Sequence, residues 1–154
     1  MKKMIFYASA TAMLLAALSR HAIAQAPKKP TLNHFALYIF DLSKSTAFYK
    51  DIVGLEMIPE PFHDGRHTWF KIGEHSQLHL IQGAKEVLPH DMNTHLCFSV
   101  PSVEDFVAHL NKAQIKYTNA RGVPQTITTR TDGVKQIYFQ DPDNYWVEIN
   151  DDKY

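Results

Sequence analysis

The sequence predicts an α+β fold made of two βαβββ modules in tandem. Three observations support it: a strand-like segment that recurs, a helical apolar stripe after each copy, and strand-like runs that close each half. The recurring segments are residues 33–39 and 94–100, which align with an offset of 61 residues. Both alternate apolar side chains with other types, which is the period of a β-strand. An internal repeat indicates that one supersecondary unit is used twice.

A helix is predicted after each recurring segment. In the first half, Asp41 or Ser43 can cap the helix and Gly54 can end it. In the second half, Ser102 is the expected cap. Apolar residues fall at helical spacing in both, namely Phe48, Ile52 and Leu55 in the first helix, and Val103, Phe106, Val107 and Leu110 in the second.

Each half is expected to close with strands that follow an Asp-Gly pair. The pairs are residues 64–65 and 132–133, and Asp-Gly is typical of a type I′ turn, in which both central residues have positive φ. The strands are predicted at 68–72 and 77–81 in the first half, and at 136–140 and 145–149 in the second. The two modules would set their sheets side by side, forming a concave cleft of mixed sheet with the helices outside.

The first 24 residues have the order of a secretory signal peptide: a basic start, an apolar run over residues 4–18, and a small-residue cleavage site ending at Ala24. The apolar run is shorter than the roughly 20 residues of a membrane span, although an uncleaved anchor is the alternative. We therefore expect a secreted or periplasmic protein, with a linker at 25–31 and one domain at 32–151. Its modules would span about 32–83 and 92–151.

Charge and cysteine content exclude several classes of function. Cleavage after Ala24 would leave 13 basic and 16 acidic residues, a net charge of −3. Nucleic-acid binding normally requires a clustered basic face, so we expect no nucleic-acid partner, and no membrane partner after cleavage. Cys97 is the one cysteine, so the fold contains no internal disulfide.

Strand alternation places four candidate metal ligands opposite the apolar side of their strands. They are His34, His79, His95 and Glu148, each on a different predicted strand. Imidazole and carboxylate ligands suit one divalent ion, which could be Zn²⁺, Ni²⁺, Mn²⁺ or Fe²⁺. Burying such a set together is costly unless a cation compensates it. The sequence therefore predicts a metal site built from both halves.

Two segments resemble a known superfamily. Residues 34–55 (HFALYIFDLSKSTAFYKDIVGL) resemble the opening of glyoxalase I and of fosfomycin-modifying thiol transferases, and residues 141–149 (DPDNYWVEI) resemble their closing motif. Both belong to the vicinal oxygen chelate (VOC) superfamily. The resemblance implies paired βαβββ modules with a metal in the cleft, and it matches His34, His95 and Glu148 to family ligands. Asn144 replaces the usual glycine of the closing motif, and asparagine tolerates the positive φ needed there.

The resemblance implies a metal-dependent enzyme that acts on a small oxygenated substrate, and we expect a glyoxalase-like lyase or isomerase. Glu148 would be both a metal ligand and the catalytic base. His79 stands where bacterial-type glyoxalase I has a glutamate, which argues against lactoylglutathione lyase activity itself. The residues expected to contact the substrate are Tyr138, Gln136, Lys71 and Trp69.

Three other functions stay open from the sequence. The first is a metal-dependent transferase or hydrolase of the fosfomycin-enzyme kind, and the second is an Fe²⁺ ring-cleaving dioxygenase. His79 argues against the dioxygenase, because it would fill a position that oxygen and substrate need. The third is a non-catalytic periplasmic protein that binds a small molecule, as bleomycin-resistance proteins do without metal. The expected partners are a small-molecule substrate and, in a homodimer, a second copy of the chain.

Overall fold

A computed structural model describes residues 29–153. The part that carries the fold is one compact unit, Leu32–Tyr154. The expected signal peptide and most of the expected linker lie outside the described residues. Within residues 29–153, no helix is long and apolar enough to cross a membrane.

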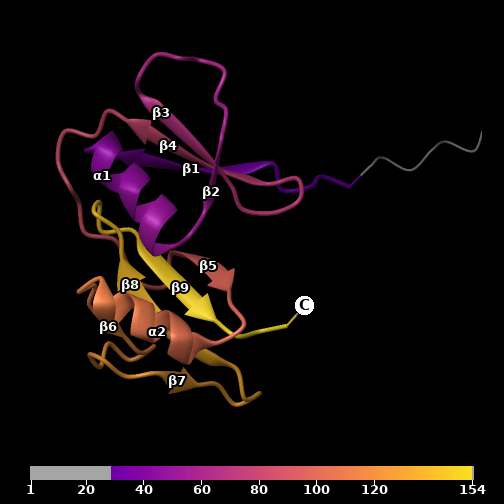
Figure 1. The fold of residues 1–154 in the computed structure, drawn as a ribbon, viewed down its shortest axis with the longest axis vertical. Helices are drawn as coiled ribbons and strands as arrows, with labels where there is room; N and C mark the ends of the chain where they lie inside the picture. Colours follow the sequence, from indigo (N-terminus) through magenta and orange to yellow (C-terminus); the bar gives the residue numbers. More distant parts are fainter. Residues whose placement is uncertain (1–28, 154) are drawn as a thin grey trace, which may run out of the picture. The chain divides into compact units, whose positions relative to one another are not determined.

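The first half of the fold is one mixed sheet with a helical segment (Figure 1). Its strands occur in the spatial order β1-β4-β3-β2, with β1 parallel to β4 and the other neighbours antiparallel. The elements are β1 (His34–Ile39), α1 (Leu42–Ala47), the π-helix η1 (Phe48–Ile52), β2 (Glu56–Ile58), β3 (His67–Lys71) and β4 (Gln77–Gln82).

The second half repeats this topology. Its strands occur in the order β5-β9-β8-β6, again with the first strand parallel to the last, and the short β7 also pairs with β8. The elements are β5 (His95–Ser99), α2 (Val103–Lys112), β6 (Tyr117–Thr118), β7 (Thr128–Thr129), β8 (Lys135–Gln140) and β9 (Trp146–Asn150). The α+β class and the tandem βαβββ modules are therefore confirmed.

The predicted helix signals are correct, but the first helix is less regular than expected. Asp41 caps α1 by accepting the Lys44 N–H at 3.1 Å, and Ser102 caps α2 in the same way. Gly54 follows the first helical segment with φ of 83°. After one short α-helix the chain widens into the π-helix η1, a feature that periodicity does not reveal.

The predicted type I′ turns are wrong. Gly65 and Gly133 have positive φ (71° and 90°), but neither preceding aspartate is among the described residues with positive φ, and a type I′ turn needs both. The Gly133 N–H instead donates to the Arg130 carbonyl at 3.0 Å. This bond closes a turn over residues 130–133, and the turn ends at a glycine with positive φ. The expectation for Asn144 is confirmed, since its φ is 64°.

The two modules share one apolar core. Leu37, Leu78 and Leu80 are buried on the helix-facing side of the first sheet. Ile137, Phe139, Val147 and Ile149 are buried on the equivalent side of the second sheet and belong to the same cluster. Burial alternates along β3 and β5, whereas β4, β8 and β9 contain consecutive buried residues, so these strands are covered on both faces.

Module 1 is fastened to module 2 by the turn between β8 and β9. The phenol of Tyr49 in η1 donates to Asp141 at 2.8 Å, and the hydroxyl of Ser45 in α1 donates to Asp143 at 2.6 Å. Asp143 also accepts the Phe40 N–H at 2.6 Å. Burial raises the pKa of Asp141 to about 6, although the hydrogen bonds it accepts oppose that shift.

This junction places the helices differently from the expected arrangement. The α1–η1 segment packs on β3 and β4 of its own sheet and also contacts module 2, where Phe48 lies 5.9 Å from Phe139 between ring centroids. His109 of α2 lies 3.2 Å from the Ile52 carbonyl. The helices therefore lie at the contact between the modules instead of outside it, because their apolar side chains are shared by both sheets.

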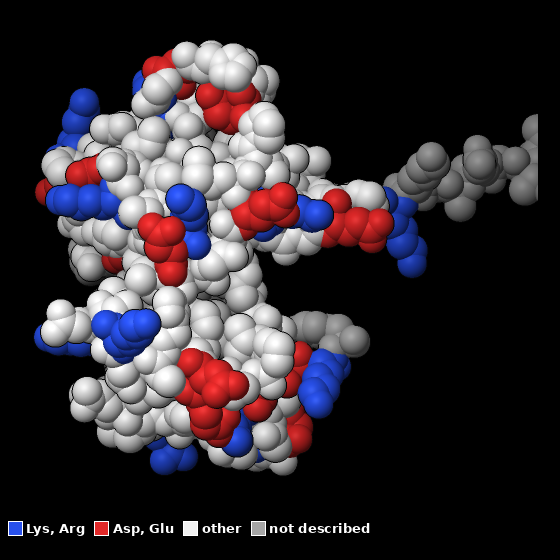
Figure 2. Space-filling view, in the orientation of Figure 1, with Lys and Arg blue, Asp and Glu red and all other residues white. Residues whose placement is uncertain are grey.

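Exposed apolar side chains gather at the edge strand β1. Phe35 and Tyr38 in β1 are 44% and 55% exposed, and Phe40 beside it is 48% exposed. Charged side chains of both signs are interspersed over both modules on the face shown in Figure 2.

The junction generates a stability prediction. Asp143→Ala leaves the Phe40 N–H and the Ser45 hydroxyl without their acceptor, and should lower the free energy of unfolding by about 3 kcal/mol. Asp143→Asn keeps one acceptor oxygen and should lose less. The exposed Asp51→Ala is the matched control, with an expected change within about 0.5 kcal/mol. Urea unfolding measures all three, and equal midpoints for Asp143→Ala and Asp51→Ala would contradict the role of the turn.

Candidate functional site

The first pair of predicted ligands lies on neighbouring strands of the first sheet. The rings of His34 and His79 are stacked, with centroids 4.3 Å apart and planes 9° apart. His34 Nδ1 lies 2.7 Å from the side-chain oxygen of Asn33, so a proton on Nδ1 leaves a lone pair on Nε2. His79 differs, because its Nε2 lies 2.8 Å from the Gln77 side-chain oxygen and is already engaged.

Trp69 extends this stack on β3. Its ring lies on the other face of His79, with centroids 3.9 Å apart and planes 2° apart. The buried indole N–H has no hydrogen-bond acceptor among the described residues. Phe62 meets Trp69 edge-on from the loop before β3, and the exposed Lys71 follows on the same strand. Trp69 therefore does share a face with His79, as strand alternation predicts.

Two features of this face differ from sequence reasoning. Phe62 was given no role, because it lies in the irregular segment between β2 and β3 where periodicity is uninformative. His67 is not among the predicted site residues, yet its side chain is only 14% exposed and hydrogen-bonds Asp64 at 2.8 Å. Burial lowers the pKa of His79, with smaller contributions from the charges of His34 and His67. His79 is thereby held as a neutral imidazole.

The second pair of predicted ligands lies on β5 and β9. His95 Nε2 is 3.0 Å from Glu148 Oε2, and Glu148 is 6% exposed. His95 Nδ1 lies 2.8 Å from the Met92 carbonyl, which can only accept, so Nδ1 carries the proton. In a neutral ring Nε2 then presents a lone pair to a carboxylate oxygen. That contact is satisfied by a proton on Nε2 or by a cation held between the two atoms.

The spacing of this pair fits a metal ion. Two ligands bound at about 2.1 Å from one metal are about 3.0 Å apart at the right angles of an octahedral site, and about 3.4 Å apart in a tetrahedral site. His34 and His95, which the internal repeat relates, are both held through Nδ1 with Nε2 directed away. An imidazole oriented by its second nitrogen is the usual form of a metal-binding histidine. The donor set therefore fits a divalent cation.

Glu148 is also held by polar neighbours on its own sheet. The Tyr138 phenol donates to Oε2 at 2.6 Å, and the Gln136 amide donates to Tyr138 at 3.0 Å. The Asn150 amide donates to Oε1 at 3.1 Å. Burial, followed by the Glu148 carboxylate, raises the pKa of Tyr138 well above its usual value. Tyr138 therefore stays a hydrogen-bond donor to Glu148.

Cys97 lies opposite Glu148 in the strand register and accepts a contact from Asn150 at 3.1 Å. The residue as a whole is exposed, but the neighbours packed against its sulfur, together with Glu148, raise the thiol pKa to about 12. A thiol with that pKa carries almost no thiolate at neutral pH. Cys97 is therefore not an activated nucleophile.

The two pairs do not meet within one chain. Among residues 29–153, no three His, Cys, Asp or Glu side chains come close enough to hold one metal ion. The expected convergence of all four ligands therefore does not occur inside the single chain. The structure brings together His34 with His79, and His95 with Glu148, while Tyr138 and Gln136 join the second pair and Trp69 joins the first.

Asn150 is a site residue to which sequence reasoning assigned no function. Strand alternation already placed it on the same face as Glu148, which was the available signal. The motif resemblance ends at Ile149, so it contributed nothing for this position.

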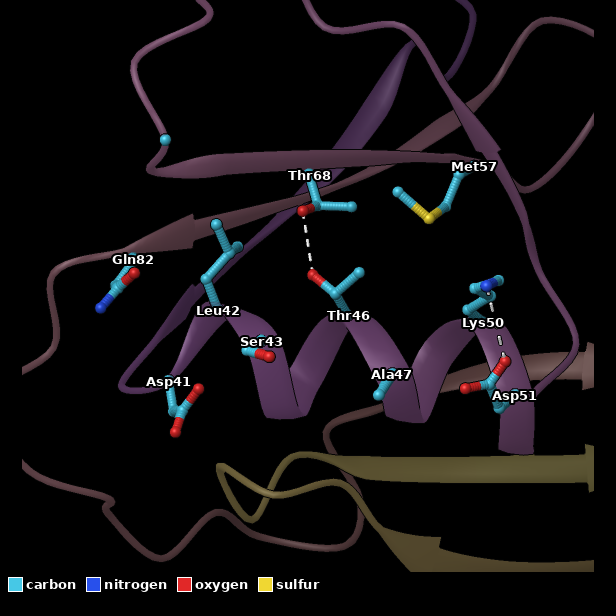
Figure 3. Close-up of a pocket in the computed structure, with 11 residues that line it drawn as sticks. Asp41, Leu42, Ser43, Thr46, Ala47, Lys50, Asp51, Met57, Thr68 and Gln82 are labelled. Atoms are coloured by element: carbon cyan, nitrogen blue, oxygen red, sulfur yellow. Dashed lines mark hydrogen bonds and ion pairs between the residues drawn. The ribbon is translucent and has the colours of Figure 1, made fainter.

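A groove beside α1 lies away from these residues. It has a volume of about 520 Å³ and runs along the outer face of α1, between that helix and β3 (Figure 3). Thr46 and Thr68 are hydrogen-bonded across it at 2.9 Å, and Lys50 and Asp51 lie at its end. A smaller cavity of about 340 Å³ borders His95, Phe35 and Trp146. Of the candidate ligands, His95 alone lines the smaller cavity, and none of them lines the groove beside α1.

Comparison with known proteins places this geometry in a family. Residues 31–149 match the Glyoxalase/Bleomycin resistance protein/Dioxygenase superfamily. The chain is 27% identical over 129 residues to the metallothiol transferase FosB of Staphylococcus epidermidis, covering 78% of this chain and 80% of FosB.

Two solved structures show the same fold. The oxidase ChaP-H1 is 25% identical, with a TM-score of 0.66 over 82% of this chain and 98% of the oxidase. The lactoylglutathione lyase of Agrobacterium tumefaciens is 23% identical, with a TM-score of 0.58 over 80% of this chain and 94% of the lyase. Because the family match covers most of the chain, the protein belongs to the glyoxalase/bleomycin resistance/dioxygenase (VOC) superfamily.

Proposed function

We propose that the protein is a divalent-metal-dependent enzyme, a glyoxalase-like lyase or isomerase acting on a small oxygenated substrate. The observation that carries this proposal is the contact of His95 Nε2 with Glu148 Oε2 at 3.0 Å, with His95 Nδ1 already committed to a carbonyl. Members of the superfamily are usually metal-dependent enzymes that act on small molecules. Both lines support a metal at this position.

The proposed ligands are Nε2 of His34, Nε2 of His95 and Oε2 of Glu148, with His79 as a fourth position once Gln77 releases its Nε2. Three neutral imidazoles and one carboxylate around a divalent ion leave a formal charge of about +1. That charge favours a substrate that offers oxygen ligands. Zn²⁺, Ni²⁺, Mn²⁺ and Fe²⁺ all suit nitrogen and oxygen donors.

The bound metal would act as a Lewis acid toward neighbouring oxygens of the substrate. Glu148 would accept the proton, since it is the only carboxylate of the set and lies in a mostly buried position. Tyr138 holds Glu148 Oε2 and is itself held by Gln136. The buried indole N–H of Trp69, which has no acceptor among the described residues, could donate to a substrate oxygen only if the residues covering it move, and Lys71 contributes positive charge nearby.

We infer that a homodimer completes the site. The two ligand pairs belong to separate sheets of one chain, and each pair includes a residue of an edge strand, β1 or β5. The β1 edge exposes Phe35 and Tyr38, which is the kind of surface that a partner covers. If β1 of one copy lies beside β5 of the other, His34 and His79 face His95 and Glu148 across the interface. Many VOC enzymes are dimers.

Two alternatives are retained on specific observations. The likeness to the metallothiol transferase FosB favours a fosfomycin-type transferase. The likeness to a protein named an oxidase, ChaP-H1, together with the superfamily that the chain belongs to, favours oxygen chemistry, of which a ring-cleaving dioxygenase is the case considered. Because Gln77 engages His79 Nε2, His79 does not have to fill the position that oxygen and substrate need, and two histidines and one carboxylate remain as ligands. A screen of α-ketoaldehydes, catechols and fosfomycin separates these reactions from one another and from a non-catalytic binding protein.

We also propose that the protein is exported and begins at Gln25 in its mature form, on the basis of the signal-peptide pattern in residues 1–24. Intact mass of the protein from an osmotic-shock fraction should equal the mass of residues 25–154. Recovery of only the full-length chain from the cytosol would contradict export.

Replacing Glu148 should separate metal binding from chemistry. Glu148→Gln keeps one oxygen donor but removes charge and basicity, so metal affinity should fall by about 10- to 100-fold. At saturating metal, turnover of the substrate found by the screen should still be lost. His79→Ala should affect affinity less than His95→Ala, and Glu104→Gln on the surface is the control. Calorimetric titration with Zn²⁺ and turnover assays decide the outcome, and wild-type turnover by Glu148→Gln would rule out Glu148 as the base.

Mixing two inactive variants tests the homodimer. One variant carries His34→Ala with His79→Ala, and the other carries His95→Ala with Glu148→Gln, so neither alone has a complete site. After unfolding and joint refolding, half of the dimers are mixed and each has one complete site, so metal content should return to about a quarter of the wild-type value. Elemental analysis measures it. No recovery would show that each site is made by one chain.

A further inference from the structure

Asn150 is the last residue of β9 and lies two positions beyond Glu148 on the same face of the sheet. It is 3% exposed, so its side-chain amide must find partners inside the protein. The amide nitrogen donates to Glu148 Oε1 and to the Cys97 sulfur, both at 3.1 Å. The amide oxygen accepts from the Ser99 hydroxyl at 3.0 Å and from the Asp152 N–H at 3.2 Å.

The orientation of this amide is fixed by a backbone group. The Asp152 N–H can only donate, so the atom that faces it must be the amide oxygen of Asn150. The amide nitrogen is then directed at Glu148, where it can only donate. Flipping the amide would place its oxygen against the carboxylate and its NH₂ against a backbone N–H. Asn150 therefore offers Glu148 a donor that cannot reverse.

The two oxygens of Glu148 consequently have different environments. Oε1 is held by Asn150, whereas Oε2 receives the Tyr138 phenol and faces His95 Nε2 at 3.0 Å. A carboxylate with one oxygen held by an amide binds a metal through the other oxygen alone. If both oxygens were free, Glu148 could chelate the ion and take a second coordination position.

We propose that Asn150 is a positioning residue that makes Glu148 a monodentate ligand through Oε2, and so leaves a coordination position open to the substrate. This inference rests on the proposed metal-dependent function. Asn150 is not one of the proposed ligands, and its hydrogen bond to Oε1 gives the two carboxylate oxygens of Glu148 different roles. A chelating substrate with two neighbouring oxygens needs two open positions on the ion, which a bidentate glutamate would reduce.

If Asn150 had a purely structural role, the variants would be expected to behave differently. The same side chain ties the edge strand β5 to β9 through Ser99. If that were its only role, Asn150→Ala and Ser99→Ala would loosen β5 alike, and would change the binding of a metal to the same extent. Ser99→Ala removes the tie without touching Glu148, and is therefore the matched control.

The test uses Co²⁺ bound to the full mature protein, because the intensity of its visible absorption falls as the coordination number rises. In Asn150→Ala, Oε1 is released and should join the ion, so the Co²⁺ bands should weaken and Co²⁺ affinity should change by about 10-fold or more. Ser99→Ala should keep the wild-type spectrum and an affinity within about 2-fold. An Asn150→Ala protein with the wild-type spectrum and affinity would overturn the proposal.

A measurement on the wild-type protein covers the case in which Asn150→Ala does not fold. With ¹⁵N-labelled asparagine, the Asn150 side-chain amide protons should stay protected from solvent exchange when Zn²⁺ is added, because the bond to Oε1 persists. Loss of that protection on metal binding would overturn the proposal. If the wild-type protein binds neither Co²⁺ nor Zn²⁺, the proposed function itself fails, so the two failures are distinguishable.

Discussion

The contact between the α1–η1 segment and the turn between β8 and β9 determines which face of each sheet is buried and which face carries the candidate ligands. Tyr49 and Ser45 reach Asp141 and Asp143 only because the helical segment contacts module 2 as well as its own sheet. The apolar faces of both sheets are thereby turned toward one shared core. The opposite face of each sheet carries one pair of candidate ligands, His34 with His79 in the first sheet and His95 with Glu148 in the second.

The orientation of the candidate ligands depends on neighbouring groups that would not themselves bind the metal. Each of the repeat-related histidines has its Nδ1 paired with an oxygen, from the side chain of Asn33 or from the backbone of Met92. The carboxylate of Glu148 has a phenol on one oxygen and an amide on the other. Fixing rotamers and tautomers before a ligand arrives reduces the entropy lost on binding, and this explains why a site built on strands can be prepared without its metal.

Much of the fold follows from the sequence because the period of two is unambiguous in this chain. It located the strands that bear His34, His79, His95 and Glu148, and the offset of 61 residues revealed the repeat. Asn144 was correctly expected to adopt positive φ, since that depends on local backbone sterics alone. The class of the fold and the faces of the strands were therefore predictable.

What the sequence could not reveal depends on contacts between distant segments. The Asp-Gly pairs were misread because the turn type depends on both central residues, and only the glycines have positive φ. The engagement of His79 by Gln77 depends on side-chain rotamers and not on periodicity. The separation of the two ligand pairs follows from the junction at Asp141 and Asp143, whose partners lie more than 90 residues away.

Burial of Asp141 has a consequence for how the protein responds to acid. Its folded pKa of about 6 exceeds its ordinary value of 3.8, so the folded state binds the proton more tightly than the unfolded chain. The resulting stabilisation is complete below pH 3.8 and is lost as the pH rises through 6. Protonation of Asp141 in mild acid removes the cost of burying its charge, and so favours the folded state. The same protonation weakens the hydrogen bond that Asp141 accepts from Tyr49, because that bond favours the ionised carboxylate.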